Sequence, residues 1–104
     1  MATVQGTPVY AAANGTVATC YYNPGGYGNV VYVNHGKNDN GVLLSSRYGH
    51  LTRWVVTPGQ KVQKGTSIIG YVGNTGNSSG AHLHFEIREN NTAVNPLQYI
   101  GANA

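Results

Sequence analysis

Short stretches rich in valine, tyrosine and threonine alternate along the chain with glycine and asparagine, at intervals of about eight to twelve residues. Twelve valines, eight tyrosines and nine threonines favour extended strands, and no stretch has the repeat of an amphipathic helix. Short strands joined by turns predict an all-β domain built on an antiparallel sheet. We expect the strands at Val9–Ala12, Thr16–Tyr22, Asn29–Asn34, Val42–His50, Ile68–Gly73 and His82–Arg88.

Turn residues between these stretches predict how the strands are joined. Asn14-Gly15 is typical of a two-residue hairpin turn and predicts that the first two strands pair with each other. Residues 23–26 and 36–41 favour longer turns. Between residues 57 and 72, turn residues and apolar residues follow one another at three-residue steps, at Gly59, Val62, Gly65 and Ile68. This spacing resembles the corner of a barrel-sandwich domain.

The 104 residues fit a single domain, so residues 1–104 are interpreted as one unit with one core. The polar segment 90–104 contains Asn95-Pro96 and is expected to leave the sheet as a C-terminal tail that covers its edge.

Charge is scarce, and this narrows the function classes. Only 9% of the residues are charged, and Asp39, Glu86 and Glu89 are too few for the paired carboxylates of a glycosidase. Six lysines and arginines give a net charge of +3 but form no basic run, so nucleic-acid binding has little support. The sequence contains no apolar run long enough to span a membrane. Cys20 has no partner for an intrachain disulfide and is expected to be a buried structural thiol.

The segment His82-Leu-His-Phe-Glu86 carries the most informative chemistry. In a strand, alternate side chains share a face at steps of about 7 Å, so His82, His84 and Glu86 are expected to project together. Two imidazoles on one face suit metal ligation or proton transfer. Glu86 is expected to pair with Arg88 or another cation rather than to bind a metal.

Other polar and aromatic residues are expected to serve the fold. His35 at a strand end is interpreted as a structural residue that hydrogen-bonds to the backbone, and Asp39 as a residue that supports its turn. Trp54 and the tyrosines are expected to lie in the core or to form the walls of a groove. The glycine-rich segment 73–80 does not have the lysine and hydroxyl residue that end a phosphate-binding loop.

Taken together, the motifs resemble those of the lysostaphin-like zinc metallopeptidases, which cut peptide cross-bridges of bacterial peptidoglycan. The resemblance covers nearly the whole chain. It is carried, in order, by Gly6-Thr-Pro-Val-Tyr-Ala, Gly28-Asn-Val-Val, Tyr48-Gly-His-Leu, Pro58-Gly-Gln-Lys-Val, Gly73-Asn-Thr-Gly and Ala81-His-Leu-His-Phe-Glu.

This resemblance implies roles for three histidines. His84 matches a zinc ligand of the family, and His82 and His50 match the residues that move protons beside the metal. In the family, two further ligands, a histidine and an aspartate four residues apart, come from a segment before the Gly6 motif. Residues 1–5 contain neither residue type, so we expect a domain truncated at its N-terminus that binds zinc weakly and is inactive alone.

The resemblance therefore predicts a zinc-dependent endopeptidase that hydrolyses peptide cross-bridges of peptidoglycan and is located outside the cell or in the cell wall. The alternative is a metal-free module of the same fold that binds the cell wall or regulates a partner. A lipoyl or biotinyl carrier is disfavoured because neither Lys61 nor Lys64 lies in a carrier hairpin motif. Exposed strand edges also predict self-association.

Overall fold

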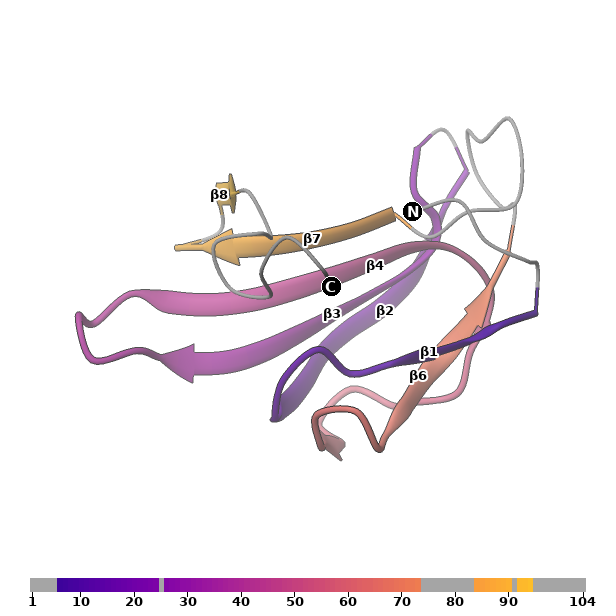
Figure 1. Cartoon of the computed structure of the whole chain (residues 1–104). Helices are drawn as coiled ribbons and strands as arrows, with labels where there is room; N and C mark the ends of the chain where they lie inside the picture. The colour runs from indigo at the N-terminus through magenta and orange to yellow at the C-terminus, as the bar shows by residue number, and fades with distance from the viewer. Residues whose placement is uncertain (1–5, 25, 74–83, 91, 95–104) are drawn as a thin grey trace.

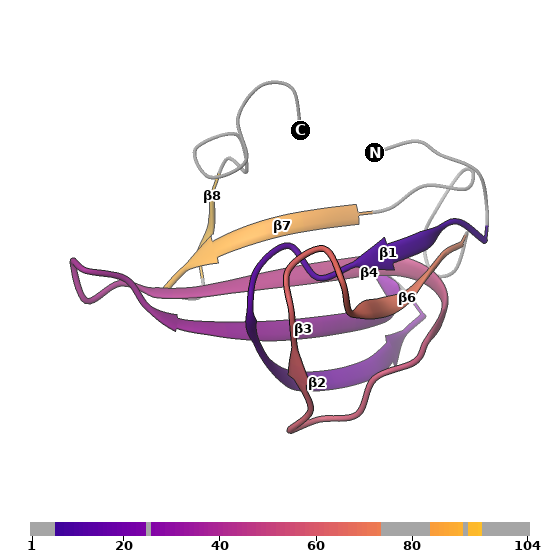
Figure 2. The same cartoon turned by 60° about the horizontal axis from the view of Figure 1, so that its bottom comes forward.

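The computed structural model describes residues 6–24, 26–73, 84–90 and 92–94, and all regular structure in this part of the chain is β-strand. Every strand pairing is antiparallel, and the strands form one curled sheet (Figures 1 and 2). The strands are β1 Pro8–Tyr10, β2 Gly15–Asn23, β3 Gly28–Lys37, β4 Leu43–Trp54, β5 Lys61–Val62, β6 Ile68–Val72, β7 His84–Glu89 and β8 Thr92–Val94. The predicted all-β antiparallel class is confirmed. A search of the described residues for a helix long and apolar enough to cross a membrane finds none.

The predicted hairpin at Asn14-Gly15 is wrong. β1 pairs with β6, through Pro8 and Tyr71, and β2 pairs instead with β3 and β5. The Asn14 side chain accepts a hydrogen bond from the Lys64 backbone N–H at 2.8 Å. A Cβ on Gly15 would lie 2.7 Å from the His35 ring nitrogen Nδ1, so this glycine permits close approach of β3 rather than a tight turn.

Two short strands were not expected from the sequence. β5 lies between turns at Gly59 and Gly65, both with positive φ, and its Val62 is buried, as the three-residue spacing predicted. β8 pairs with β7, so residues 92–94 extend the sheet where the sequence had predicted a tail. The remainder of that predicted tail, residues 95–104, lies outside the described residues.

β4 is the central strand of the sheet (Figure 1). Along one edge it pairs with β3 from Leu43 to Leu51. Along the other edge its first half, Leu44 to Gly49, pairs with β7, and its second half, Leu51 to Trp54, pairs with β6. The partner therefore changes at His50.

The core is one cluster of buried side chains contributed by β1 to β6 and the segments next to them. Its buried members are Val9, Ala11, Val17, Val31, Val33, Tyr48, Leu51, Val56, Val62, Ile69 and Val72. Cys20 packs against this cluster but is only half-buried, less than the sequence predicted, and its burial raises the pKa of the thiol. Such close packing restricts the motion of the strands that contribute the core side chains.

A series of hydrogen bonds beside the core gives His35 its structural role. The Tyr48 hydroxyl accepts a hydrogen bond from the Ala12 N–H at 3.0 Å and lies 2.8 Å from the Ser46 hydroxyl. His35 joins this series, with Nε2 at 2.8 Å from Ser46 Oγ and Nδ1 at 2.8 Å from the Asn14 carbonyl oxygen. His35 thus hydrogen-bonds to the backbone, as expected.

His50 adopts a left-handed backbone conformation at the point where β4 changes partner. Its φ is 58°, its side chain is buried, and its N–H donates a hydrogen bond to the Tyr27 carbonyl oxygen at 2.5 Å. This region costs a residue with a Cβ about 1–2 kcal/mol, so the surrounding pairings must hold the backbone there.

We expect His50→Gly to be more stable than His50→Ala by about 1–2 kcal/mol, because glycine has no Cβ to strain at positive φ. Both variants lose the same imidazole, so their difference isolates the backbone. The free energy of unfolding from urea titration measures it. As a control, Ser45→Ala should be more stable than Ser45→Gly by about 0.5–1 kcal/mol, because Ser45 lies in the same strand with ordinary φ. The same order at both positions would contradict the strain at His50.

Candidate active site

The β4–β7 register brings His50 and His84 together. Gly49 is the residue directly opposite His84, and the two imidazole ring centroids are 6.0 Å apart with the rings nearly perpendicular. Tyr27 packs beside both rings, with its centroid 4.8 Å from that of His84 and 6.5 Å from that of His50. His82 lies outside the described residues. Two of the three histidines singled out from the sequence are therefore neighbours in the structure.

Gly49 makes room for this arrangement. A Cβ at Gly49 would lie 3.2 Å from Cβ of Tyr27 and 3.3 Å from Cβ of His84, closer than Cβ contacts normally are. The glycine between Tyr48 and His50 is thus needed where a turn, β4 and β7 converge.

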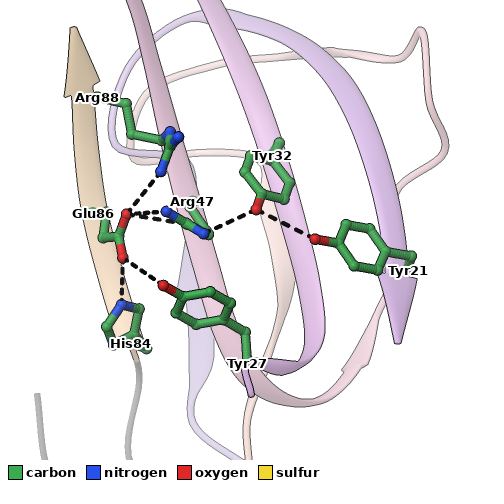
Figure 3. Close-up of polar contacts among 7 residues, drawn as sticks. All are labelled: Tyr21, Tyr27, Tyr32, Arg47, His84, Glu86 and Arg88. Atoms are coloured by element: carbon green, nitrogen blue, oxygen red, sulfur yellow. Dashed lines mark hydrogen bonds and ion pairs between the residues drawn. The ribbon is translucent and has the colours of Figure 1, made fainter. Parts of the chain in front are cut away.

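The carboxylate of Glu86 connects His84 to two arginines (Figure 3). Its Oε2 lies 2.6 Å from Nε2 of His84 and accepts a hydrogen bond from the Tyr27 hydroxyl at 3.3 Å. Its Oε1 accepts hydrogen bonds from Nε of Arg47 at 3.1 Å, from Nη2 of Arg47 and from Nη1 of Arg88 at 3.2 Å. The expected pairing of Glu86 with Arg88 is confirmed, and Arg47 and His84 are additional partners.

These partners keep Glu86 ionised although its side chain is only 14% exposed. Burial is the largest single influence and raises the pKa of the carboxyl group, because it disfavours the charged form. The hydrogen bonds from His84 and Arg47, together with the electrostatic attraction of the same two groups, outweigh burial, so the pKa of Glu86 lies below its ordinary value. Glu86 is therefore a fixed negative charge beside His84 at neutral pH.

Arg47 links this carboxylate to a row of tyrosines on β3 and β2. Its guanidinium lies 4.3 Å from the ring centroid of Tyr27 and 5.2 Å from that of Tyr32, and Nη1 donates to the Tyr32 hydroxyl at 3.0 Å. Tyr32 stacks on Tyr21 with ring centroids 6.0 Å apart. The contacts thus run continuously from His84 on β7 across β4 and β3 to β2 (Figure 3).

Sequence reasoning did not single out Tyr27 or Arg47. Arg47 lies directly opposite Glu86 in the β4–β7 register, so a cross-strand pair of opposite charge was the available signal. This signal could be recognised only with knowledge of the strand register, because Arg47 and Glu86 are 39 positions apart in the sequence. Tyr27 lies in the turn before β3, and we find no signal in the sequence that marks it.

The described residues offer part of a metal site. A catalytic zinc has about three protein ligands, and the described part of the chain holds no group of three or more His, Cys, Asp or Glu placed to bind a metal. The imidazole of His84 is 36% exposed and fits one bond to zinc. His35 and Asp39 have a four-residue spacing, but both ring nitrogens of His35 are engaged by Asn14 and Ser46.

Comparison with known proteins shows the family of the chain. The sequence profile of peptidase family M23 matches residues 1–96. Over 93 residues, the chain is 47% identical to an uncharacterised metalloprotease of Haemophilus influenzae and 39% identical to the peptidoglycan DD-endopeptidase ShyA of Vibrio cholerae. Each match covers 89% of this chain but only 18% and 20% of those relatives, so the chain spans about a fifth of their length.

Solved structures show the same fold. The catalytic domain of the antimicrobial peptidase lysostaphin from Staphylococcus simulans has a TM-score of 0.82 and 31% identity, covering 97% of this chain and 75% of that one. A zinc-containing peptidase from Vibrio cholerae has a TM-score of 0.79 and 36% identity, covering 88% of this chain and 26% of that one. The chain therefore belongs to peptidase family M23, with a lysostaphin-like fold.

Proposed function

We propose that this chain is the peptidase domain of a zinc-dependent endopeptidase that hydrolyses peptide cross-bridges of bacterial peptidoglycan. The observation that carries the proposal is the pairing of His50 and His84 beside Tyr27, in a chain of family M23. A relative named as a peptidoglycan DD-endopeptidase and the lysostaphin structure support the substrate class. With such a substrate, we propose that the protein acts in the cell envelope, outside the cell or in the cell wall.

His84 is the proposed metal ligand contributed by the described residues. When bound, zinc polarises a peptide carbonyl and lowers the pKa of a bound water to about 7. Among the described residues, His84 supplies one bond to zinc. By resemblance to the family, the 104 residues are proposed to bind zinc only weakly by themselves. A histidine and an aspartate from a segment before Gly6 would complete the site, by resemblance to the family.

His50 and His82 are the proposed proton-moving residues. His50 suits this role because it is buried and held by a strained backbone, so its imidazole does not need to be ordered when substrate binds. Histidine changes its charge near neutral pH, which lets it take a proton from water and pass it to a leaving amine.

The stacked pair of exposed Tyr21 and half-buried Tyr32 offers a surface on which substrate can lie. Tyr21 stacks on Tyr32 and remains 40% exposed, on the same row of contacts that reaches His84. Aromatic rings of this kind bury apolar area while their hydroxyls hydrogen-bond to a polar peptide or sugar.

The metal assignment is tested in the chain fused to a family segment that carries the His-x-x-x-Asp pair. We expect His84→Ala to lose zinc, because a ligand is removed. His82→Ala should keep zinc and lose turnover by about 10²-fold or more, the usual scale for a general acid or base. Zinc stoichiometry and the rate of peptidoglycan hydrolysis measure the two effects, and Asp39→Asn, a substitution in an exposed turn, is the control that should change neither.

Loss of zinc in His82→Ala with retention in His84→Ala would contradict the assignment. Stoichiometric zinc binding and hydrolysis by the 104 residues alone would contradict the proposal that their set of zinc ligands is incomplete. Binding to peptidoglycan with neither zinc nor hydrolysis in the fused chain would favour the alternative, a metal-free cell-wall-binding or regulatory module. Self-association through strand edges stays a prediction that light scattering tests.

A further inference from the structure

The hydrogen-bond geometry at Glu86 determines which ring nitrogen of His84 carries a proton. The two carboxylate oxygens have separate partners: Oε1 faces Arg47 and Arg88, and Oε2 faces His84 and Tyr27. An ionised carboxylate only accepts hydrogen bonds. Nε2 of His84, 2.6 Å from Oε2, must therefore be the protonated nitrogen.

A neutral imidazole carries one proton, so protonation of Nε2 leaves the lone pair of His84 on Nδ1. Metal ions bind the unprotonated nitrogen, and the hydrogen bond made by the other nitrogen decides which one that is. The ring is also held by Tyr27, whose centroid lies 4.8 Å away. The orientation and the tautomer of His84 are thus both set by residues that do not themselves have to touch a metal.

We propose that Glu86 is a positioning residue that holds His84 in the tautomer protonated on Nε2 and so presents Nδ1 as its metal-binding nitrogen. This inference rests on the proposed function, because it assumes that His84 is a ligand. Glu86 itself acts through His84 and not on the substrate.

Because of the two arginines, only a carboxylate at position 86 can position His84 in this way. A side chain with a single acceptor oxygen cannot. Arg47 is 10% exposed and Arg88 is 17% exposed, and both direct N–H groups at Oε1. A glutamine at this position would turn its carbonyl oxygen toward these two cations, since guanidinium groups only donate. Its amide NH₂ would then face Nε2 of His84. Nε2 would have to accept, and the ring proton would move to Nδ1.

The experiment is a long-range ¹H–¹⁵N correlation spectrum of the metal-free chain, recorded at a pH at which the His84 ring is neutral. We expect the unmodified chain to carry its proton on Nε2 and Glu86→Gln to carry it on Nδ1. Glu89→Gln is the matched control: it lies on the same strand but on the opposite face, and should leave the tautomer unchanged.

A proton on Nδ1 in the unmodified chain would overturn the proposal, and this result needs no variant to fold. An unchanged tautomer in a folded Glu86→Gln chain would overturn it as well. Neither result depends on hydrolysis, so neither bears on whether the protein is a peptidase.

Zinc affinity gives a second readout. In the chain fused to the His-x-x-x-Asp segment, with Zn²⁺ alone as the probe, the dissociation constant reported by the His84 ring signals should rise about 10–100-fold in Glu86→Gln, the usual effect of removing a carboxylate that orients a ligating histidine. Glu89→Gln should leave it unchanged. Equal zinc affinity in Glu86→Gln and the unmodified chain would refute the positioning role while His84 could still be a ligand. Zinc retention in His84→Ala would instead refute the proposed function, whichever tautomer the ring adopts.

Discussion

Strand β4 pairs with three other strands, and the rest of the structure depends on which of its residues pair with each of them. Its first half pairs with β7 and its second half with β6, while β3 follows most of its other edge. The change of partner occurs at His50, which adopts a left-handed conformation there. Buried Tyr48 and Leu51 anchor the strand on both sides of this residue. The core therefore fixes the position of His50, and the β7 pairing fixes His84 beside it.

Charge is concentrated where these strands meet. One of the three acidic residues of the chain, Glu86, is mostly buried there with two of its six cations. A buried charge is tolerated only when it is paired and hydrogen-bonded, and Glu86 satisfies this condition through four different side chains. Such a network is a costly way to stabilise a sheet, since apolar residues of similar volume often serve equally well. We propose that the function of this network is to orient His84.

Much of this arrangement follows from the sequence, because alternation along a strand and turn chemistry are local. The main strands, the turns near residues 23–26 and 36–41, and the shared face of His84 and Glu86 were all expected on those grounds. The features that the sequence did not predict depend on contacts between distant segments. Asn14-Gly15 has the composition of a hairpin turn, yet the hydrogen bonds of Asn14 go to His35 on β3 and to Lys64. Arg47 meets Glu86 only through the β4–β7 register, and the conformation of His50 arises only where two pairings meet.

The most direct test of this account is anomalous diffraction at the zinc absorption edge, from zinc-soaked crystals of the chain fused to a family segment that carries the His-x-x-x-Asp pair. The account predicts an anomalous peak at bonding distance from Nδ1 of His84, with Glu86 still hydrogen-bonded to Nε2. A peak on Nε2 of His84 with Glu86 turned away, or a peak at His35 with none at His84, would contradict it.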